Sequence, residues 1–233
     1  MKAQTLQGKV GLFGIGLAAY WPQFKGLKRR LENYQRSVAG RLGNSCEVVD
    51  AGLIDTAPKA AAAGELFARE SVELVVCYVA TYATSSQVLP AVQQARAPVL
   101  ILNLQPGSAL DYEQTGTGEW LANCCACCVP EIACAFARSR IDFHVVTGVL
   151  GVERGRFGEA APDHPDSRSA WREIADWVSA ATTVNRLKRS RLGFLGHTYP
   201  GMLDLYSDFT QHTAQFGTHI EVLEMCDLAA RLP

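Results

Sequence analysis

Hydrophobic and polar positions follow two patterns that alternate along the chain. Short apolar runs rich in Val, Ile and Leu are followed by longer stretches in which apolar residues recur every three or four positions. The first pattern is typical of buried strands and the second of amphipathic helices. The predicted strands span residues 10–15, 46–50, 74–79, 99–104 and 143–150, and the predicted helices span residues 23–42, 57–70, 86–95 and 118–138.

Regular alternation of strand and helix predicts a parallel sheet that helices cover on both faces, with right-handed crossover connections. The expected fold class is therefore α/β, a flavodoxin-like doubly wound parallel sheet in a three-layer α/β/α arrangement. An incomplete second α/β unit is expected to follow it.

The composition changes after Gly151. Residues 153–168 are rich in Gly, Pro, Asp and Arg, which favours a surface loop. A helix is predicted over 169–187, followed by a strand over 192–195, a helix over 201–216 and a strand over 220–225. One β-α-β unit is too small for an independent sheet. We expect an N-terminal domain over 1–155, and over 156–233 a linker helix and the truncated start of a second domain. Either these last elements pack on the first sheet or the chain is the front part of a longer protein.

Composition excludes several classes of function. The 233 residues are 48% apolar with a formal net charge of −1, and the short basic stretch Lys188–Arg191 reads as a solvated helix end, so nucleic acid is not an expected partner. No apolar stretch reaches the ~18 residues of a membrane span, and no signal-peptide pattern precedes the first strand. We expect a soluble, cytoplasmic protein with no membrane partner.

Known sequence motifs for nucleotide binding and for serine hydrolysis are incomplete or absent in the chain. The turn Gly14-Ile15-Gly16 lacks the third glycine of a dinucleotide site because Ala19 stands there, although Asp50 follows at the end of the second predicted strand. The Tyr20–Pro22 insertion disfavours a tight pyrophosphate turn. Neither a Gly-Lys-Ser phosphate loop nor a Gly-x-Ser-x-Gly elbow is present.

Cysteines gather in the segment Asn123–Cys128. Cys124 with Cys127, and Cys125 with Cys128, form CxxC pairs, each sharing one face of a helix. A metal site needs four convergent ligands, and no second group of cysteines lies nearby in the sequence. Metal binding and a redox role stay open, but small buried thiols, some of them lining a pocket, are favoured.

Hydroxyl side chains end the third predicted strand. The stretch Cys77–Ser86 closes an apolar run and opens a helical pattern, and ligands of open parallel sheets bind at that end of the strands. A small polar ligand is therefore expected there. His197 stands at a similar junction, whereas His144 falls inside a strand and is expected in the core.

Several short pieces of the chain are similar, in order, to the L-arabinose isomerases. They are Gly16–Gln23, Leu74–Val76 with Thr81-Tyr82, Pro98–Leu100 leading to Gln105, Val145–Gly148, and Arg191–His197. The related L-fucose isomerases share this design.

The resemblance implies an aldose–ketose isomerase with a divalent metal, usually manganese, held by two glutamates and two histidines that lie beyond this chain. It implies that the chain contributes sugar binding and contacts in a homo-oligomer, a trimer or hexamer, and that alone it is inactive and holds no metal. The substrate-binding residues that we expect are Tyr20, Thr81, Tyr82, Gln105, Cys124, Cys127, His197 and Tyr199. Two sugar-contacting signatures of these isomerases are replaced here by Leu17–Pro22 and Asn123–Cys127, which points to a different substrate or to a subfamily that has drifted from isomerisation.

Two other readings remain. A sugar-binding module resembling two-lobed periplasmic binding proteins would need a complete second lobe and a signal peptide. A flavodoxin-like nucleotide enzyme would need a phosphate-cradling loop.

Overall fold

The structure is a computed structural model that describes residues 8–153, 158–196, 201–202 and 207–232. It divides into two compact units, Met1–Ser179 and Ala180–Pro233. The unit boundary lies inside the long helix α6 (Pro165–Lys188), whereas the expected domain boundary at residue 155 lies ahead of it. The first half of α6 belongs with the first unit because its residues Ala170, Ile174 and Val178 are buried.

Five parallel strands form the centre of the first unit, in the order β2-β1-β3-β4-β5. This is the expected flavodoxin-like order, and the fold class is confirmed. Strand β2 is added on one side of β1, whereas β3, β4 and β5 are added on the other, so the strand order reverses between β1 and β3. The strands are β1 (Lys9–Ile15), β2 (Glu47–Ile54), β3 (Leu74–Tyr78), β4 (Val99–Gln105) and β5 (Phe143–Val149).

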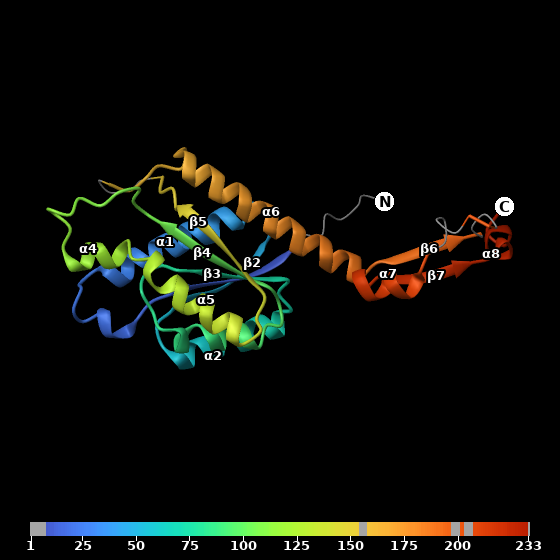
Figure 1. Cartoon of the computed structure of the whole chain (residues 1–233), viewed down its shortest axis with the longest axis horizontal. Coiled ribbons are helices and arrows are strands. Elements are labelled where there is room, and N and C mark those ends of the chain that lie inside the picture. Colours follow the sequence, from blue (N-terminus) through green and yellow to red (C-terminus); the bar gives the residue numbers. More distant parts are fainter. Residues whose placement is uncertain (1–7, 154–157, 197–200, 203–206, 233) are drawn as a thin grey trace. The chain divides into compact units, whose positions relative to one another are not determined.

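Helices cover both faces of this sheet (Figure 1). Helix α1 (Leu27–Leu42) and α6 lie on one face. Arg41 of α1 connects them, because its guanidinium lies 4.0 Å from the centre of the Trp171 ring of α6. The same guanidinium donates to the Leu150 carbonyl, just after β5, at 2.9 Å. The other face carries α2 (Ala57–Glu70), α3 (Leu89–Gln93) and α5 (Val129–Arg138). The short helix α4 (Thr117–Ala122) stands beyond the carboxyl ends of the strands, beside α1.

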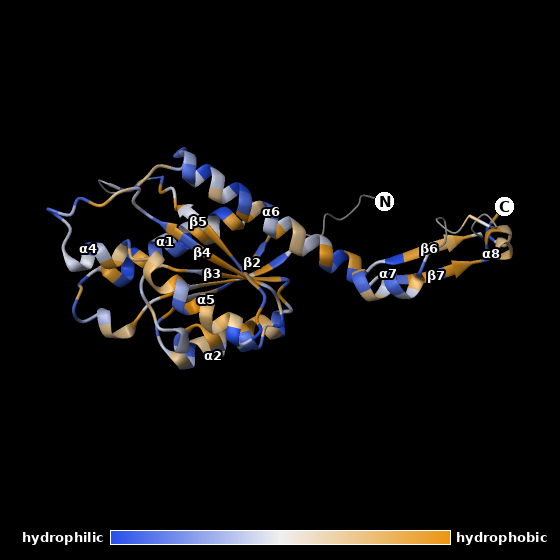
Figure 2. Ribbon diagram, in the orientation of Figure 1, coloured by the Kyte–Doolittle hydropathy of each residue, from blue (hydrophilic) through white to orange (hydrophobic). Residues whose placement is uncertain are grey.

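The core follows from the apolar strand sequences. All five residues of β3 are buried, as are six of the seven in β4, because helices cover these central strands on both sides. In Figure 2 the central strands are mostly orange, and the helices carry their blue positions away from the sheet. Because these strands are buried, the pairing of each strand with its neighbour is fixed. In this pairing the carboxyl ends of β1, β3 and β4 lie side by side.

The single helix predicted over 118–138 is wrong. The chain instead forms α4, a 3₁₀ turn at Ala126–Cys128 and α5. Pro130 explains part of the break, because a proline has no N–H to donate and its ring clashes with the carbonyl four residues earlier. The predicted start of the first helix at residue 23 also moves, to Leu27, because Gly26 has a left-handed φ of 83°.

In the second unit, β6 (Arg191–Leu195) and β7 (His219–Leu223) form a separate two-stranded parallel sheet. Helices α7 (Phe209–Phe216) and α8 (Met225–Ala229) accompany it. Leu192, Leu195 and Val222 are exposed, so this unit buries few of its large apolar side chains. The strands match the predicted ones within two residues at each end.

Among the described residues, no helix combines the length and the apolar character that a membrane crossing requires.

Gly148 of β5 tests the packing of α6 on the sheet. A Cβ at Gly148 would lie 2.7 Å from Ala170 Cβ and 2.8 Å from the Asp166 carbonyl oxygen, whereas nothing lies within 4 Å of a Cβ at Gly40 on α1. We expect Gly148→Ala to lower the free energy of unfolding by about 1–3 kcal/mol because α6 must move away from β5. Gly40→Ala, the control, is expected to be neutral or to stabilise by up to ~1 kcal/mol. Urea unfolding of both variants measures the difference, and equal stability of the two would contradict this packing.

Candidate functional site

The carboxyl edge of the five-stranded sheet carries the candidate site. Three connections meet there, comprising residues 16–26 after β1, 79–88 after β3 and 106–116 after β4. Ligands of doubly wound sheets bind at this edge, where the strand order reverses. In this chain the reversal lies between the β1 and β3 connections.

Tyr20 lies near several of the other predicted residues. Its ring is half-buried and packs edge-on against Trp21 and Phe24, with centroids 6.5 and 6.2 Å apart. Burial raises the pKa of Tyr20, and the nearby Tyr82, Cys124 and other thiols raise it further. Four of the eight predicted residues, Tyr20, Tyr82, Cys124 and Cys127, therefore lie in one electrostatic neighbourhood.

The other four predicted residues are placed differently. Thr81 is fully buried, and its hydroxyl donates to the Leu121 carbonyl at 2.6 Å, so this hydroxyl holds the end of α4. Gln105 is half-buried at the end of β4, where its carbonyl accepts from Leu150 N at 2.8 Å. His197 and Tyr199 lie outside the described residues. His144, expected in the core, instead has a partly exposed ring that contacts Glu173 at 2.7 Å and stacks on Trp177.

Most thiols of the cysteine cluster are buried and protonated. Burial raises the pKa of Cys125, and that of Cys128 to about 11. Burial raises the pKa of Cys124 as well, and a hydrogen bond with the Cys127 thiol adds to it. The Cys128 thiol donates to the Thr81 carbonyl at 3.7 Å, while Cys127 is exposed. Protonated, packed thiols are poor nucleophiles and poor metal ligands.

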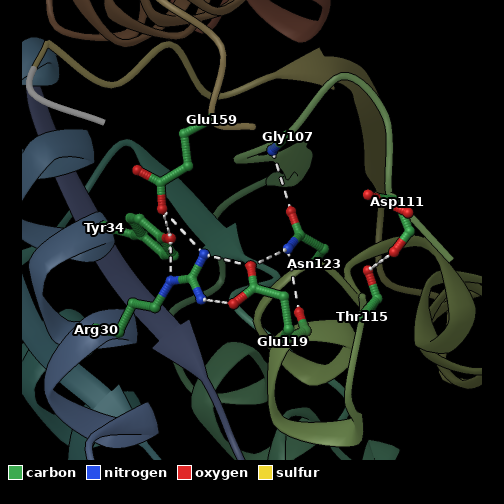
Figure 3. Close-up of polar contacts among 8 residues, drawn as sticks. All are labelled: Arg30, Tyr34, Gly107, Asp111, Thr115, Glu119, Asn123 and Glu159. Atoms are coloured by element: carbon green, nitrogen blue, oxygen red, sulfur yellow. Dashed lines mark hydrogen bonds and ion pairs between the residues drawn. The ribbon is translucent and has the colours of Figure 1, made fainter. Parts of the chain in front are cut away.

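A partly buried ion-pair network lies beside this cluster (Figure 3). Arg30 on α1 donates two hydrogen bonds to the Glu119 carboxylate of α4, at 2.5 and 2.8 Å, and one to Glu159 at 3.0 Å. Tyr34 accepts a hydrogen bond from Arg30 and donates one to Glu159. Asn123 donates to the Glu119 backbone carbonyl at 3.1 Å and accepts from Gly107 N at 3.1 Å.

Burial and this bonding set the charges of the network. Burial raises the pKa of Tyr34, and its hydrogen bond to Glu159 raises it further, so the phenol stays neutral. Burial alone would lower the pKa of Arg30, but the Glu119 and Tyr34 contacts outweigh it and raise the pKa. The network is thus one buried cation held between two carboxylates, and it joins α1, α4 and the segment that contains Glu159.

An open cavity of about 610 Å³ lies against this network. Its lining combines an aromatic ring, amide and guanidinium donors and a carboxylate. The lining residues are Phe24, Lys25, Gly26, Leu27, Arg29, Arg30, Asn33, Gly118 and Glu119. Phe24 connects the two parts of the site, because it packs against Tyr20 and also lines the cavity.

These cavity residues were not among the predicted site residues. A signal was present in the sequence, since four basic residues stand within the six positions from Lys25 to Arg30. Such a run on a helix is more often a solvated face. Only the tertiary structure shows that α4 closes over it and makes a cavity.

Asp55 was also missed, and it holds the β1 connection in place. Its carboxylate follows β2 and accepts from Trp21 Nε1 at 2.8 Å and Lys59 Nζ at 2.6 Å. Burial alone would raise the pKa of Asp55, but these two hydrogen bonds and the charges of Lys59 and Lys28 lower it on balance. The aromatic segment from Tyr20 to Phe24 is thus tied to the end of β2.

Comparison with known proteins assigns no family to the chain. No protein-family model matches it, and no curated protein matches it. Thirty-nine chains of solved structures do. Among them are a carbohydrate acetylesterase from Sinorhizobium meliloti (TM-score 0.44, 15% identity, covering 75% of this chain and 99% of that one) and an inhibitor-bound aryl esterase from M. smegmatis (TM-score 0.41, 14% identity, covering 75% and 99%). A third is a solute-binding protein of an ABC transporter from Burkholderia multivorans (TM-score 0.31, 15% identity, covering 94% of this chain and 60% of that one).

These findings overturn the expected resemblance to the arabinose and fucose isomerases. The named structures are two esterases and a solute-binding protein, and no isomerase family model matches. The isomerase function, and the manganese chemistry that it implied, are withdrawn. The physical reason is that the matching pieces were mostly apolar strands, such as Leu74–Val76, which every parallel sheet of this kind contains. TM-scores below 0.5 transfer no activity from the esterases either.

Among the described residues of the first unit, His144 and His164 are the histidines, and their contacts can be compared with those of an esterase triad. Such a triad needs a serine hydroxyl hydrogen-bonded to a histidine that an acidic side chain orients. His144 contacts Glu173, and His164 Nδ1 accepts from Asp166 N at 3.3 Å. Neither contact involves a serine hydroxyl.

Within the described ranges, no group of three or more His, Cys, Asp or Glu side chains could hold a metal ion. The absence of a bound metal stays a prediction. Because the thiols of Cys124, Cys125 and Cys128 are protonated and packed, we expect the purified protein to contain less than about 0.1 zinc or iron per chain. Elemental analysis measures this. One metal per chain that is lost in Cys127→Ser would contradict it, and Cys226→Ser, at an exposed cysteine of the second unit, is the control.

The Asp55 anchor predicts a pH-dependent stability. We expect Asp55→Asn to lower the free energy of unfolding at pH 7 by about 1–3 kcal/mol, since it removes a charge from two buried hydrogen bonds. Because the pKa of Asp55 is lower in the folded state than in the unfolded state, its contribution is present above the ordinary aspartate pKa and is lost as pH falls through the folded value. The difference between wild type and variant should therefore shrink in acid.

Chemical unfolding between pH 7 and pH 3 measures this difference. Asp176→Asn, at an exposed position of α6, is the control and should change stability by less than ~0.5 kcal/mol. A difference for Asp55→Asn that stays constant down to pH 3 would contradict the anchoring role.

Proposed function

We propose that the first unit binds a small molecule with several hydroxyl groups, the class that includes sugars, at the carboxyl edge of its sheet. The observation that carries this proposal is the 610 Å³ cavity between α1 and α4. Its size lies within the usual range for small-molecule sites, and it is found at the edge where doubly wound sheets bind ligands.

The chemistry of the lining supports a polyhydroxylated ligand. Hydroxyl groups both donate and accept hydrogen bonds, so a sugar needs partners of both kinds and an apolar wall for its C–H face. Glu119 supplies acceptor oxygens, and the side-chain amide of Asn33 supplies donors. Phe24, supported by Tyr20, supplies the aromatic wall. Tyr20, Tyr82, Cys124 and Cys127 remain proposed contacts on the adjoining side of this ring.

The ion pair of Arg30 with Glu119 supports a preformed site. Both side chains are fixed by several hydrogen bonds before any ligand arrives, so little side-chain entropy is lost on binding. The exposed fraction of the Arg30 side chain is 12% and that of Glu119 is 42%, so the carboxylate is the member of the pair that a ligand can reach.

Cytoplasmic residence and self-association also belong to the proposal. All eight cysteines are free, which is typical of a reducing compartment. The expectation of a trimer or hexamer came from the isomerase resemblance; the mass of the chain in solution by light scattering measures it.

Gly118 offers a test of the cavity. A Cβ at Gly118 would lie 3.3 Å from Phe24 Cδ1, so a larger side chain there must displace this ring and fill the cavity. We expect Gly118→Leu to weaken binding of neutral hexoses, pentoses or sorbitol by at least about tenfold, measured by calorimetric titration. Gly116→Leu is the matched control, because nothing lies within 4 Å of a Cβ there and Gly116 does not line the cavity.

Thermal unfolding of both variants checks that they fold. If a neutral polyol binds wild type and Gly118→Leu equally well, the cavity is not the site. If none of the probes binds wild type, the proposed ligand class is wrong.

A further inference from the structure

Several basic side chains lie at the amino end of α1, the end of a helix at which positive charge is unfavourable. Lys28, Arg29 and Arg30 occupy the first turn, Lys25 precedes it, and no acidic residue lies in that turn. A helix amino end carries a partial positive charge, so cations there are destabilising and anions are stabilising. A sequence selected only for helix stability would place Asp or Glu at these positions.

Two of the four cations are neutralised within the protein. Arg30 pairs with Glu119 and Glu159, and Lys28 lies 3.7 Å from Asp55 and 4.0 Å from Glu32. Lys25 and Arg29 make no ion pair with any residue in the described ranges, and both line the cavity. The cavity lining thus holds three basic side chains, Lys25, Arg29 and Arg30, against the single carboxylate of Glu119.

The backbone adds donors on the same side. Gly26, the residue before the helix, has no side chain that could cap it, and no side-chain hydrogen bond caps the helix. Leu27 N donates to the Phe24 carbonyl and Arg30 N to the Gly26 carbonyl, but no described carbonyl accepts from the N–H of Lys28 or Arg29. Gly26 and Leu27 both line the cavity, so this first turn borders it.

We propose that the ligand of this cavity carries a phosphate monoester, which Lys25 and Arg29 bind at the amino end of α1. This inference rests on the proposed binding function and names the class of its ligand as a phosphorylated polyol. A phosphate monoester carries about −1.5 to −2 charges near pH 7, which matches the two unpaired cations, whereas a carboxylate carries only one. The three phosphate oxygens can accept from the ammonium, the guanidinium and the backbone N–H groups together.

The arrangement separates two roles. The phosphate sits beside Lys25 and Arg29, and the hydroxyl groups face Glu119 and the Phe24 ring. Arg30 is a positioning residue, because its hydrogen bonds hold Glu119 rather than the ligand.

Calorimetric titration with four probes tests this inference: glucose 6-phosphate, glucose, glucuronate and inorganic phosphate. We expect glucose 6-phosphate to bind at least about tenfold more tightly than glucose or glucuronate, and its affinity to fall as NaCl is raised from 50 to 300 mM. Lys25→Gln and Arg29→Gln should each weaken its binding by about tenfold and leave the binding of glucose unchanged. Arg172→Gln, at an exposed position of α6, is the matched control and should change neither.

The outcomes separate this inference from the proposed function. If glucose binds and the phosphate group adds no affinity, or if glucuronate binds as tightly as glucose 6-phosphate, the phosphate inference is wrong and the polyol site stands. If inorganic phosphate binds as tightly as glucose 6-phosphate, the anion site stands and the polyol proposal fails. If no probe binds, both are wrong. If Arg172→Gln weakened the binding of glucose 6-phosphate as much as Arg29→Gln does, the loss of affinity would come from the net charge of the protein rather than from a phosphate site. That result would also overturn the inference.

Discussion

The candidate site depends on the burial of one guanidinium group. Removing a charge from water costs several kcal/mol unless hydrogen bonds and opposite charges compensate for it. Arg30 receives this compensation from Glu119 and Glu159, which lie 89 and 129 positions away in the sequence. The planar fork of its five donors matches two carboxylates better than a lysine could. The amino end of α1, helix α4 and the segment around Glu159 must therefore come together for any one of them to be stable in place.

The cavity is a consequence of that constraint. Once α4 is fixed against α1, Phe24 and Gly118 form one side of the space and the Arg30–Glu119 pair forms another. Arg30 is occupied by its own carboxylates, so the cations of the cavity lining that have no ion pair with a described residue are Lys25 and Arg29. The proposed ligand chemistry thus follows from which charges the fold neutralises and which it leaves unpaired.

The same reasoning explains why the cysteine cluster does not supply the chemistry. Its thiols lie where α4 gives way to α5, and the carbonyls of Leu104 and Thr81 accept from two of them. Burial keeps them protonated, so they pack rather than react.

The amino-acid sequence by itself determined the layers of the first unit. The apolar runs from Leu74 and Val99 predict the buried strands β3 and β4, and α2 occupies the predicted residues 57–70, because the hydrophobic pattern is a local property of the chain. The sequence could not assign the function, since short apolar pieces are common to all parallel sheets, and the resemblance built on them was wrong. It also could not show that Arg30 would meet Glu119 and Glu159, or that Thr81 would use its hydroxyl on Leu121. Those pairings join residues that are far apart in the chain, so only the tertiary structure decided which polar groups are already satisfied and which remain available to a ligand.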